Sequence, residues 1–198
     1  KEKEKIFKEF LASSSRYHDI VLKSLFSNLK DIDQLHKNYD FINAMDMYFI
    51  TRNIKNYESI IDYGSGYGRL GLMFGNNTLV KKYIAIDSIE LSYMLQSLVL
   101  RSMFKNNFNE YIDAAFEGKD FQIDQPNSKN MVYHLPTWKW KLINKQSIDL
   151  ITAVFVLSET NEFAINNFLE MAIHTVKIGG HMYIRDHFYK EGEQRHKG

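Results

Sequence analysis

The chain has 198 residues, with 25 Lys and Arg against 24 Asp and Glu, so its formal net charge is +1. This length suits one domain with a hydrophobic core, and the near-zero charge argues against a surface dedicated to DNA or RNA. The absence of cysteine excludes disulfides, thiolate metal sites and a cysteine nucleophile. No apolar run approaches the roughly 20 residues that a membrane span needs, and no signal peptide is recognisable. We therefore expect a cytoplasmic protein.

Residues 1–56 are predicted to form helices. Apolar residues recur at helical spacing in two stretches of this segment, and no glycine occurs before Gly64. The segment is interpreted either as packing for the main domain or as an N-terminal helical cap over a ligand site.

From Tyr57 the pattern changes to strands that alternate with helices. Buried strands are predicted at residues 59–62, 83–87, 131–134, 148–155 and 181–185. Such alternation predicts an α/β fold with a doubly wound, mostly parallel sheet. Sheets of this kind bind ligands at the carboxyl ends of their strands. We assign the main domain to residues 57–190 and a solvated tail to residues 191–198.

Helices are predicted between these strands. One helix begins at Leu70, and Gly179-Gly180 is expected to end the helix that precedes the fifth strand. Two helical faces are defined by Leu91, Met94, Leu95, Leu98 and Ser102, and by Ile165, Phe168, Leu169, Ala172 and Val176. Residues 105–130 are polar and are expected to be irregular, which suggests an insertion or a lid.

The strongest motif is IIDYGSGYGRL at residues 60–70. Three glycines at alternate positions follow a buried strand and open a helix, so a ligand could approach the backbone closely. A dinucleotide-binding loop would have glycine or alanine where Arg69 stands, and Asp62 would repel an anionic pyrophosphate. A carboxylate there suits a cationic ligand, and S-adenosylmethionine carries an ammonium and a sulfonium group.

Asp87 ends the second predicted strand, 19 residues after Gly68. A carboxylate at this place can accept hydrogen bonds from both hydroxyls of a ribose. The alternative is that Asp87 or Ser88 caps the helix that follows. The glycine loop upstream makes ribose binding the favoured interpretation.

The glycine motif, together with YIAID at residues 83–87, resembles the cofactor half of class I S-adenosylmethionine-dependent methyltransferases over roughly residues 57–188. GSGYGRL, the helix containing Gln96, HLP at 134–136 and SIDLITAVFVLSE at 147–159 are also similar to bacterial sugar O-methyltransferases. The resemblance implies a Rossmann-like sheet of seven strands, of which the pattern predicts five. Strands 6 and 7 are therefore expected to be missing, as in part of a longer protein.

The resemblance also implies roles for matching residues. The glycine loop would hold the methionine part of the cofactor, the end of the second strand its ribose, and residues 134–137 its adenine. Arg69 would neutralise the cofactor carboxylate or Asp62, or pair with a surface acid. The cofactor-binding residues implied are Asp62, Gly64, Ser65, Gly66, Gly68, Asp87, Ser88, Leu135, Ala153 and Val154.

Three residues after the fourth and fifth strands are catalytic candidates. Methyl transfer to oxygen requires alignment of the reactants and removal of a proton from the acceptor. His187 is the candidate general base, and Glu159 and Asp186 could orient it or hold a substrate hydroxyl. The alternatives are helix capping at 158–161 and a solvated strand end at Asp186 and His187. A divalent metal on these three residues is a further alternative that no ligand spacing supports.

The predicted function is an S-adenosylmethionine-dependent O-methyltransferase that acts on a sugar hydroxyl of a glycan or a glycosylated metabolite. Trp138 and Trp140 could form an aromatic platform for a sugar or adenine ring, or could pack in the core. One alternative is a tRNA methyltransferase, because VKIGG at 176–180 and YIRDH at 183–187 resemble such enzymes. Another is a catalytically inactive cofactor-binding activator subunit. We expect neither DNA nor a membrane as a partner, and the abundance of Lys and Asn over Arg suggests a bacterial source.

Overall fold

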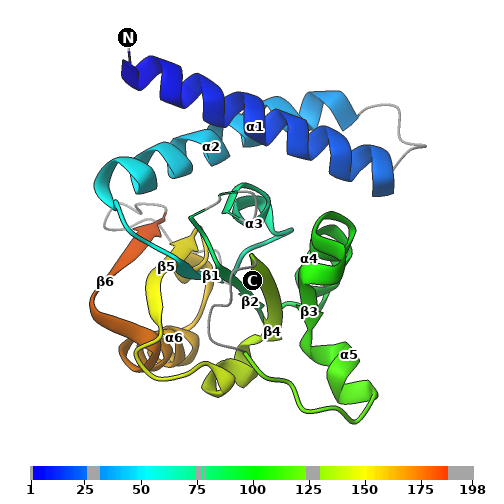
Figure 1. The fold of residues 1–198 in the computed structure, drawn as a ribbon, viewed down its shortest axis with the longest axis vertical. Helices are drawn as coiled ribbons and strands as arrows, with labels where there is room; N and C mark the ends of the chain where they lie inside the picture. The colour runs from blue at the N-terminus through cyan, green and yellow to red at the C-terminus, as the bar shows by residue number, and fades with distance from the viewer. Residues whose placement is uncertain (1, 26–31, 75–76, 78, 124–129, 187–198) are drawn as a thin grey trace.

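The computed structural model describes the chain except for residues 1, 26–31, 75–76, 78, 124–129 and 187–198 (Figure 1). Its centre is a six-stranded sheet in the order β3-β4-β2-β1-β5-β6, and every pairing is parallel. The strands are β1 (Ser59–Tyr63), β2 (Lys82–Asp87), β3 (Phe108–Glu110), β4 (Met131–Pro136), β5 (Ile148–Val154) and β6 (Val176–Arg185). The predicted parallel α/β fold is confirmed.

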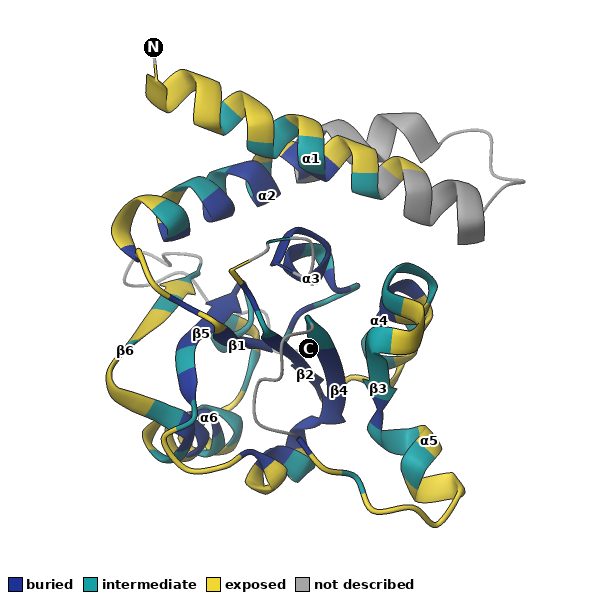
Figure 2. Cartoon of the chain, in the orientation of Figure 1, coloured by how far each residue is buried: buried dark blue, intermediate teal, exposed yellow. Residues whose placement is uncertain are grey.

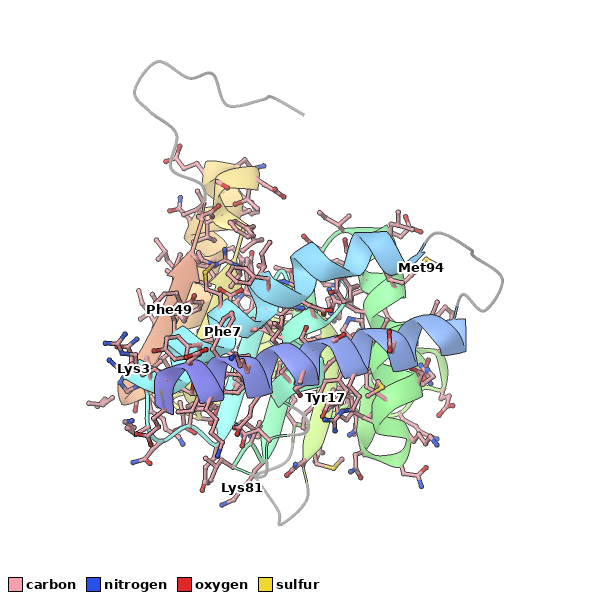
Figure 3. All side chains as sticks on the ribbon, turned by 90° about the horizontal axis from the view of Figure 1, so that it is seen from above. Lys3, Phe7, Tyr17, Phe49, Lys81 and Met94 are labelled. Carbon is pink, nitrogen blue, oxygen red and sulfur yellow. The ribbon has the colours of Figure 1, made fainter. Side chains whose placement is uncertain are left out.

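Helices cover both faces of this sheet (Figure 1). One face carries α2 (Ile32–Asn53), α3 (Arg69–Phe74) and α4 (Glu90–Phe104), and α1 (Glu2–Leu25) lies across them. The other face carries α6 (Glu162–Thr175). The remaining short elements are α5 (Tyr111–Phe116), η1 (Lys105–Asn107), η2 (Thr137–Leu142) and η3 (Leu157–Glu159). Seen from above, α1 and α2 run across the sheet and Tyr17 lies on α1 (Figure 3).

The four central strands are almost wholly buried, as Figure 2 shows by its dark blue strands. Successive side chains of a strand point to opposite faces, so Ile60 packs with Met47 and Ile50 of α2, whereas Ile61 packs with Phe168 of α6. Continuous apolar runs are typical of parallel strands covered on both faces. The N-terminal helices therefore share a core with the sheet.

A buried carboxylate ties α2 to the sheet. Asp46 is fully buried and accepts hydrogen bonds from Arg185 Nε (2.6 Å), from Arg185 Nη2 (2.7 Å) and from Tyr183 Oη (2.8 Å). Arg69 Nη1 lies 3.1 Å from Asp46 and also donates to Asn43 Oδ1 (2.7 Å). Arg69 therefore pairs with a buried acid of α2 and not with a surface acid.

Two local expectations from the sequence are wrong. Residues 105–130 are not irregular throughout, because they contain η1, β3 and α5. The three-residue strand β3 has too few positions to show a periodicity, so its pattern could not reveal it. The helix before the last predicted strand does not end at Gly179-Gly180. This helix, α6, stops at Thr175, and both glycines lie within β6, where the pairing with β5 shifts register.

The apolar face that the pattern defines on α4 is largely exposed. Leu91, Met94 and Leu98 are 76%, 57% and 54% exposed, whereas Gln96, Val99 and Leu100 are buried. The helix turns Gln96 toward the sheet, where its amide forms hydrogen bonds with Asp87 and His134. No helix in the described ranges is long and apolar enough to cross a membrane.

Candidate functional site

The glycine loop after β1 has the conformation that its three glycines predict. Gly64, Gly66 and Gly68 have φ values of 65°, 59° and 82°, a region in which other residues are strained. A Cβ on Gly64 would lie 2.4 Å from Val156 Cγ2, whereas a Cβ on Gly66 would meet no atom within 4 Å. The loop is thus packed tightly at Gly64 and open at Gly66.

Asp62 lies beneath this loop. It is 2% exposed, and its carboxylate accepts hydrogen bonds from Tyr83 Oη (2.6 Å) and Thr152 Oγ1 (2.7 Å). Burial raises the pKa of Asp62 to about 6, although both hydroxyls and the charge of Arg69 act in the opposite direction. Asp62 therefore joins β1, β2 and β5 from inside the sheet.

Asp87, at the end of β2, is held by donors of a different kind. Its Oδ1 accepts from the backbone N–H groups of Ser88 (2.7 Å) and Ile89 (3.0 Å), and its Oδ2 accepts from Gln96 Nε2 (2.7 Å). These bonds fix the turn into α4. They also leave Asp87 on the wall of a cavity, so the capping role and a ligand-binding role are compatible.

This cavity has a volume of about 620 Å³ and opens at the carboxyl ends of β1, β2, β4 and β5. It brings together four of the predicted site residues: Gly64, Asp87, Ser88 and Glu159. Trp138, Trp140 and the N-terminal part of α6 also line it, and Trp138 lines a neighbouring cavity with Asp87 and Ser88. The position of the cavity agrees with the rule that parallel sheets bind ligands at their strand ends.

A buried hydroxyl on the cavity wall lacks a partner. Thr137 follows β4 and is 9% exposed, and its Oγ1 has no hydrogen-bond partner within the described residues. Buried polar atoms in proteins are nearly always paired, so this atom indicates a polar ligand in the cavity. Ser65 Oγ, beside Tyr83, likewise has no partner of acceptable geometry in the described ranges.

The other predicted cofactor residues do not line the cavity. They are Asp62, Ser65, Gly66, Gly68, Leu135, Ala153 and Val154. Leu135 and Ala153 are fully buried in the core, and Val154 is 7% exposed at the end of β5. Their proposed contacts with a cofactor remain predictions.

The structure describes two of the three catalytic candidates, Asp186 and Glu159. Asp186 accepts hydrogen bonds from both the backbone N–H (2.8 Å) and the hydroxyl of Ser158, so it anchors η3 to the end of β6. Glu159, the next residue of η3, lies on the cavity wall. His187 falls outside the described residues. No group of three His, Asp or Glu side chains that could hold a metal is found in the described part of the chain.

Phe155 is a feature that the sequence does not reveal. It follows β5 directly and has a φ of 57°, which is unusual for a bulky residue and is found most often at functional sites. The guanidinium of Arg185 lies 4.2 Å from the centre of its ring. The sequence assigns Phe155 to the fourth strand, because strand propensity gives no sign of a left-handed residue.

The order of the sheet and the placement of its helices match a class I methyltransferase fold of the Rossmann-like type. No protein-family model matches the chain, and no curated protein matches it. Solved structures resemble the chain at low sequence identity, and this similarity shows the fold alone.

Three solved structures illustrate the similarity. Phosphoethanolamine N-methyltransferase 1 from Haemonchus contortus, in complex with phosphoethanolamine and S-adenosylhomocysteine, has a TM-score of 0.50 and 16% identity, over 93% of this chain and 32% of that one. The YcgJ protein from Bacillus subtilis has a TM-score of 0.48 and 14% identity, over 73% and 51%. The [4+2]-cyclase SpnF has a TM-score of 0.49 and 12% identity, over 75% and 45%. The chain thus spans about half or less of the length of these proteins.

Proposed function

We propose that the chain is an S-adenosylmethionine-dependent methyltransferase that acts on a hydroxyl group of a sugar. The observation that carries the proposal is the cavity, because its lining includes the glycine loop and Asp87 as well as Trp138 and Glu159. The first two suit a nucleoside-bearing methyl donor, and the last two suit a polar acceptor with an apolar face.

The cofactor side fits S-adenosylmethionine by its chemistry. Asp87 accepts hydrogen bonds from its neighbours, is in contact with the cavity and can hold ribose hydroxyls. The Thr137 hydroxyl, which has no partner among the described residues, can bond to a polar part of the ligand. When bound, S-adenosylmethionine supplies an electrophilic methyl group on its sulfonium.

The acceptor side combines an aromatic surface with polar groups. Trp138 is 66% exposed on the cavity wall, and Trp140 Nε1 donates to Asn167 Oδ1 (3.0 Å), which fixes the second indole. Binding sites often pair apolar surfaces with a few placed polar groups, and a sugar ring presents both kinds of surface. The formal net charge of +1 gives no support to an RNA acceptor.

Glu159 is the residue to which we assign proton removal. With S-adenosylmethionine bound, the acceptor oxygen would form its bond to the methyl carbon, and the electron pair of the broken carbon–sulfur bond would stay on sulfur. The hydroxyl proton passes to the Glu159 carboxylate, which lies on the cavity wall. Asp186 is a positioning residue, because its two bonds to Ser158 hold η3 in place.

The test is a methyl-transfer assay with radiolabelled S-adenosylmethionine, free sugars, oligosaccharides and bulk tRNA, with and without magnesium. We expect label in a sugar acceptor, and we expect Glu159→Gln to lower the rate by about 100-fold. Glu170→Gln is the matched control, because Glu170 is an exposed carboxylate of α6 outside the cavity.

Three outcomes would contradict parts of the proposal. Label in tRNA and in no sugar would show that the acceptor is RNA and not a sugar. Tight binding of S-adenosylmethionine without transfer to any acceptor would favour an inactive cofactor-binding subunit. Equal rates for Glu159→Gln and Glu170→Gln would remove the proton-transfer role from Glu159.

A further inference from the structure

Behind Asp87 runs a chain of buried polar side chains that crosses from β2 to β3. Gln96 of α4 donates from Nε2 to Asp87 Oδ2 (2.7 Å), and its Oε1 lies 2.9 Å from Nε2 of His134 on β4. The other ring nitrogen of His134, Nδ1, lies 2.6 Å from Oε2 of Glu110 at the end of β3. Gln96 and His134 are fully buried, and Asp87 and Glu110 are 6% and 7% exposed.

The hydrogen-bonding capacity of these groups fixes the direction of each bond. Asp87 already accepts two backbone N–H groups, so it is an acceptor and must face the amide nitrogen of Gln96. The amide oxygen of Gln96 then faces His134, which must donate from Nε2. At Nδ1, His134 meets a carboxylate that already accepts the hydroxyl of Tyr93. With Glu110 ionised, the two contacts require His134 to donate from both nitrogens, which only an imidazolium can do.

Aromatic rings and charged groups surround this histidine. The ring centres of Tyr93 of α4 and Phe108 of β3 lie 3.8 Å and 6.2 Å from the centre of the His134 ring. Burial opposes ionisation of Glu110, but hydrogen bonds from His134 and Tyr93 outweigh it and lower the pKa of that carboxyl. Asp113 of α5, also close to Tyr93, forms an ion pair with Arg101 of α4 (2.7 Å).

Resting on the proposed function, we propose that Gln96 and His134 are positioning residues for cofactor binding. Imidazolium His134 locks the Gln96 amide in one orientation, and that amide holds Asp87 toward the cavity as an acceptor for the ribose. The pair of Glu110 and His134 is electrically neutral overall, so the negative charge of Asp87 is left for the ligand.

Gln96 is the residue to test, because it contacts both Asp87 and His134 but does not line the cavity. Gln96→Met keeps the length of the side chain and removes both hydrogen bonds. We expect the dissociation constant of S-adenosylmethionine, measured by calorimetry on the full chain, to rise about tenfold. Thr175→Val is the matched control, because Thr175 is a fully buried hydroxyl that bonds to Met171 O of its own helix (2.8 Å).

The charge of His134 is tested without any ligand. Nitrogen NMR of the histidine-labelled chain, with His134→Asn to assign the signal, should show both ring nitrogens protonated at pH 7. In Gln96→Met the Nε2 signal should change its pH profile, which a general loss of stability in Thr175→Val would not cause. A neutral ring in the wild-type protein would overturn the inference.

The binding measurement with S-adenosylmethionine separates this inference from the function on which it rests. If the wild-type chain does not bind S-adenosylmethionine, both are overturned. If the wild type binds and Gln96→Met binds as tightly as Thr175→Val, the proposed function stands and the positioning role is overturned. If Gln96→Met does not fold, Gln96→Glu replaces it, because a carboxylate facing Asp87 should weaken binding still further.

Discussion

Two carboxylates lie at the carboxyl ends of the neighbouring strands, Asp62 one residue before the end of β1 and Asp87 as the last residue of β2, and the fold surrounds them differently. Asp62 is held by the hydroxyls of Tyr83 and Thr152 inside the sheet, and burial raises its pKa to about 6. Asp87 is held by two backbone N–H groups and an amide, and it lies on the cavity wall. The same residue type thus supports the fold near the end of one strand and lines the cavity at the end of the next.

The largest expected effect concerns the stability conferred by Asp62. A raised pKa in the folded state means that folding favours the protonated carboxyl, so this contribution is present in acid and is lost as the pH rises toward about 6. Asp62→Asn cannot titrate. Its free energy of unfolding, relative to wild type, should improve by up to about 3 kcal/mol between pH 4 and pH 7.

Urea unfolding at a series of pH values measures this difference directly. Asp87→Asn serves as the comparison, since Asp87 is bonded to backbone donors at the surface of a cavity. If the free energies of unfolding of Asp62→Asn and wild type differed by the same amount at every pH, ionising Asp62 would cost the folded state nothing. The proposed difference between the two carboxylates would then be wrong.

The next effect concerns ligand binding by Asp87. Asp87→Ala removes the acceptor proposed for the ribose, so its dissociation constant for S-adenosylmethionine should rise about 100-fold, or about 2.7 kcal/mol. Asp62→Asn should weaken binding less, because Asp62 does not line the cavity. Isothermal titration of both variants provides the measurement, and a larger loss for Asp62→Asn would reverse the roles assigned to the two residues.

A smaller effect is expected within the glycine loop that follows Asp62. Gly64→Ala and Gly66→Ala both force alanine into positive φ, but only the first also places a Cβ against Val156. Gly64→Ala should therefore be the less stable variant by about 2 kcal/mol. Thermal unfolding of the two proteins tests this, and equal melting temperatures would mean that Val156 moves aside freely.

The parts of the fold with local signals could be predicted from the sequence. The central strands are continuous apolar runs, so the sequence predicts β1, β2, β4 and β5 within a residue or two. Three glycines at alternate positions predict the positive φ values of the loop. Asp87 could be proposed for the site because it is the last residue of the strand that follows that loop.

The remaining features depend on contacts between distant residues. Thr152 is 90 positions from Asp62, and Arg185 is 139 positions from Asp46. No local pattern reveals such pairs, so the pairing of Arg69 with α2 and the anchoring of η3 by Asp186 emerged only from the structure. The buried Gln96 likewise reversed the expected face of α4, because a tertiary hydrogen bond outweighed helical periodicity.

The most direct test of the central claim is a calorimetric titration of the wild-type chain with S-adenosylmethionine and, separately, with NAD. The cavity beside the glycine loop and Asp87 predicts saturable binding of one S-adenosylmethionine per chain and no binding of NAD. Tight binding of NAD with none of S-adenosylmethionine would contradict the assignment of this site.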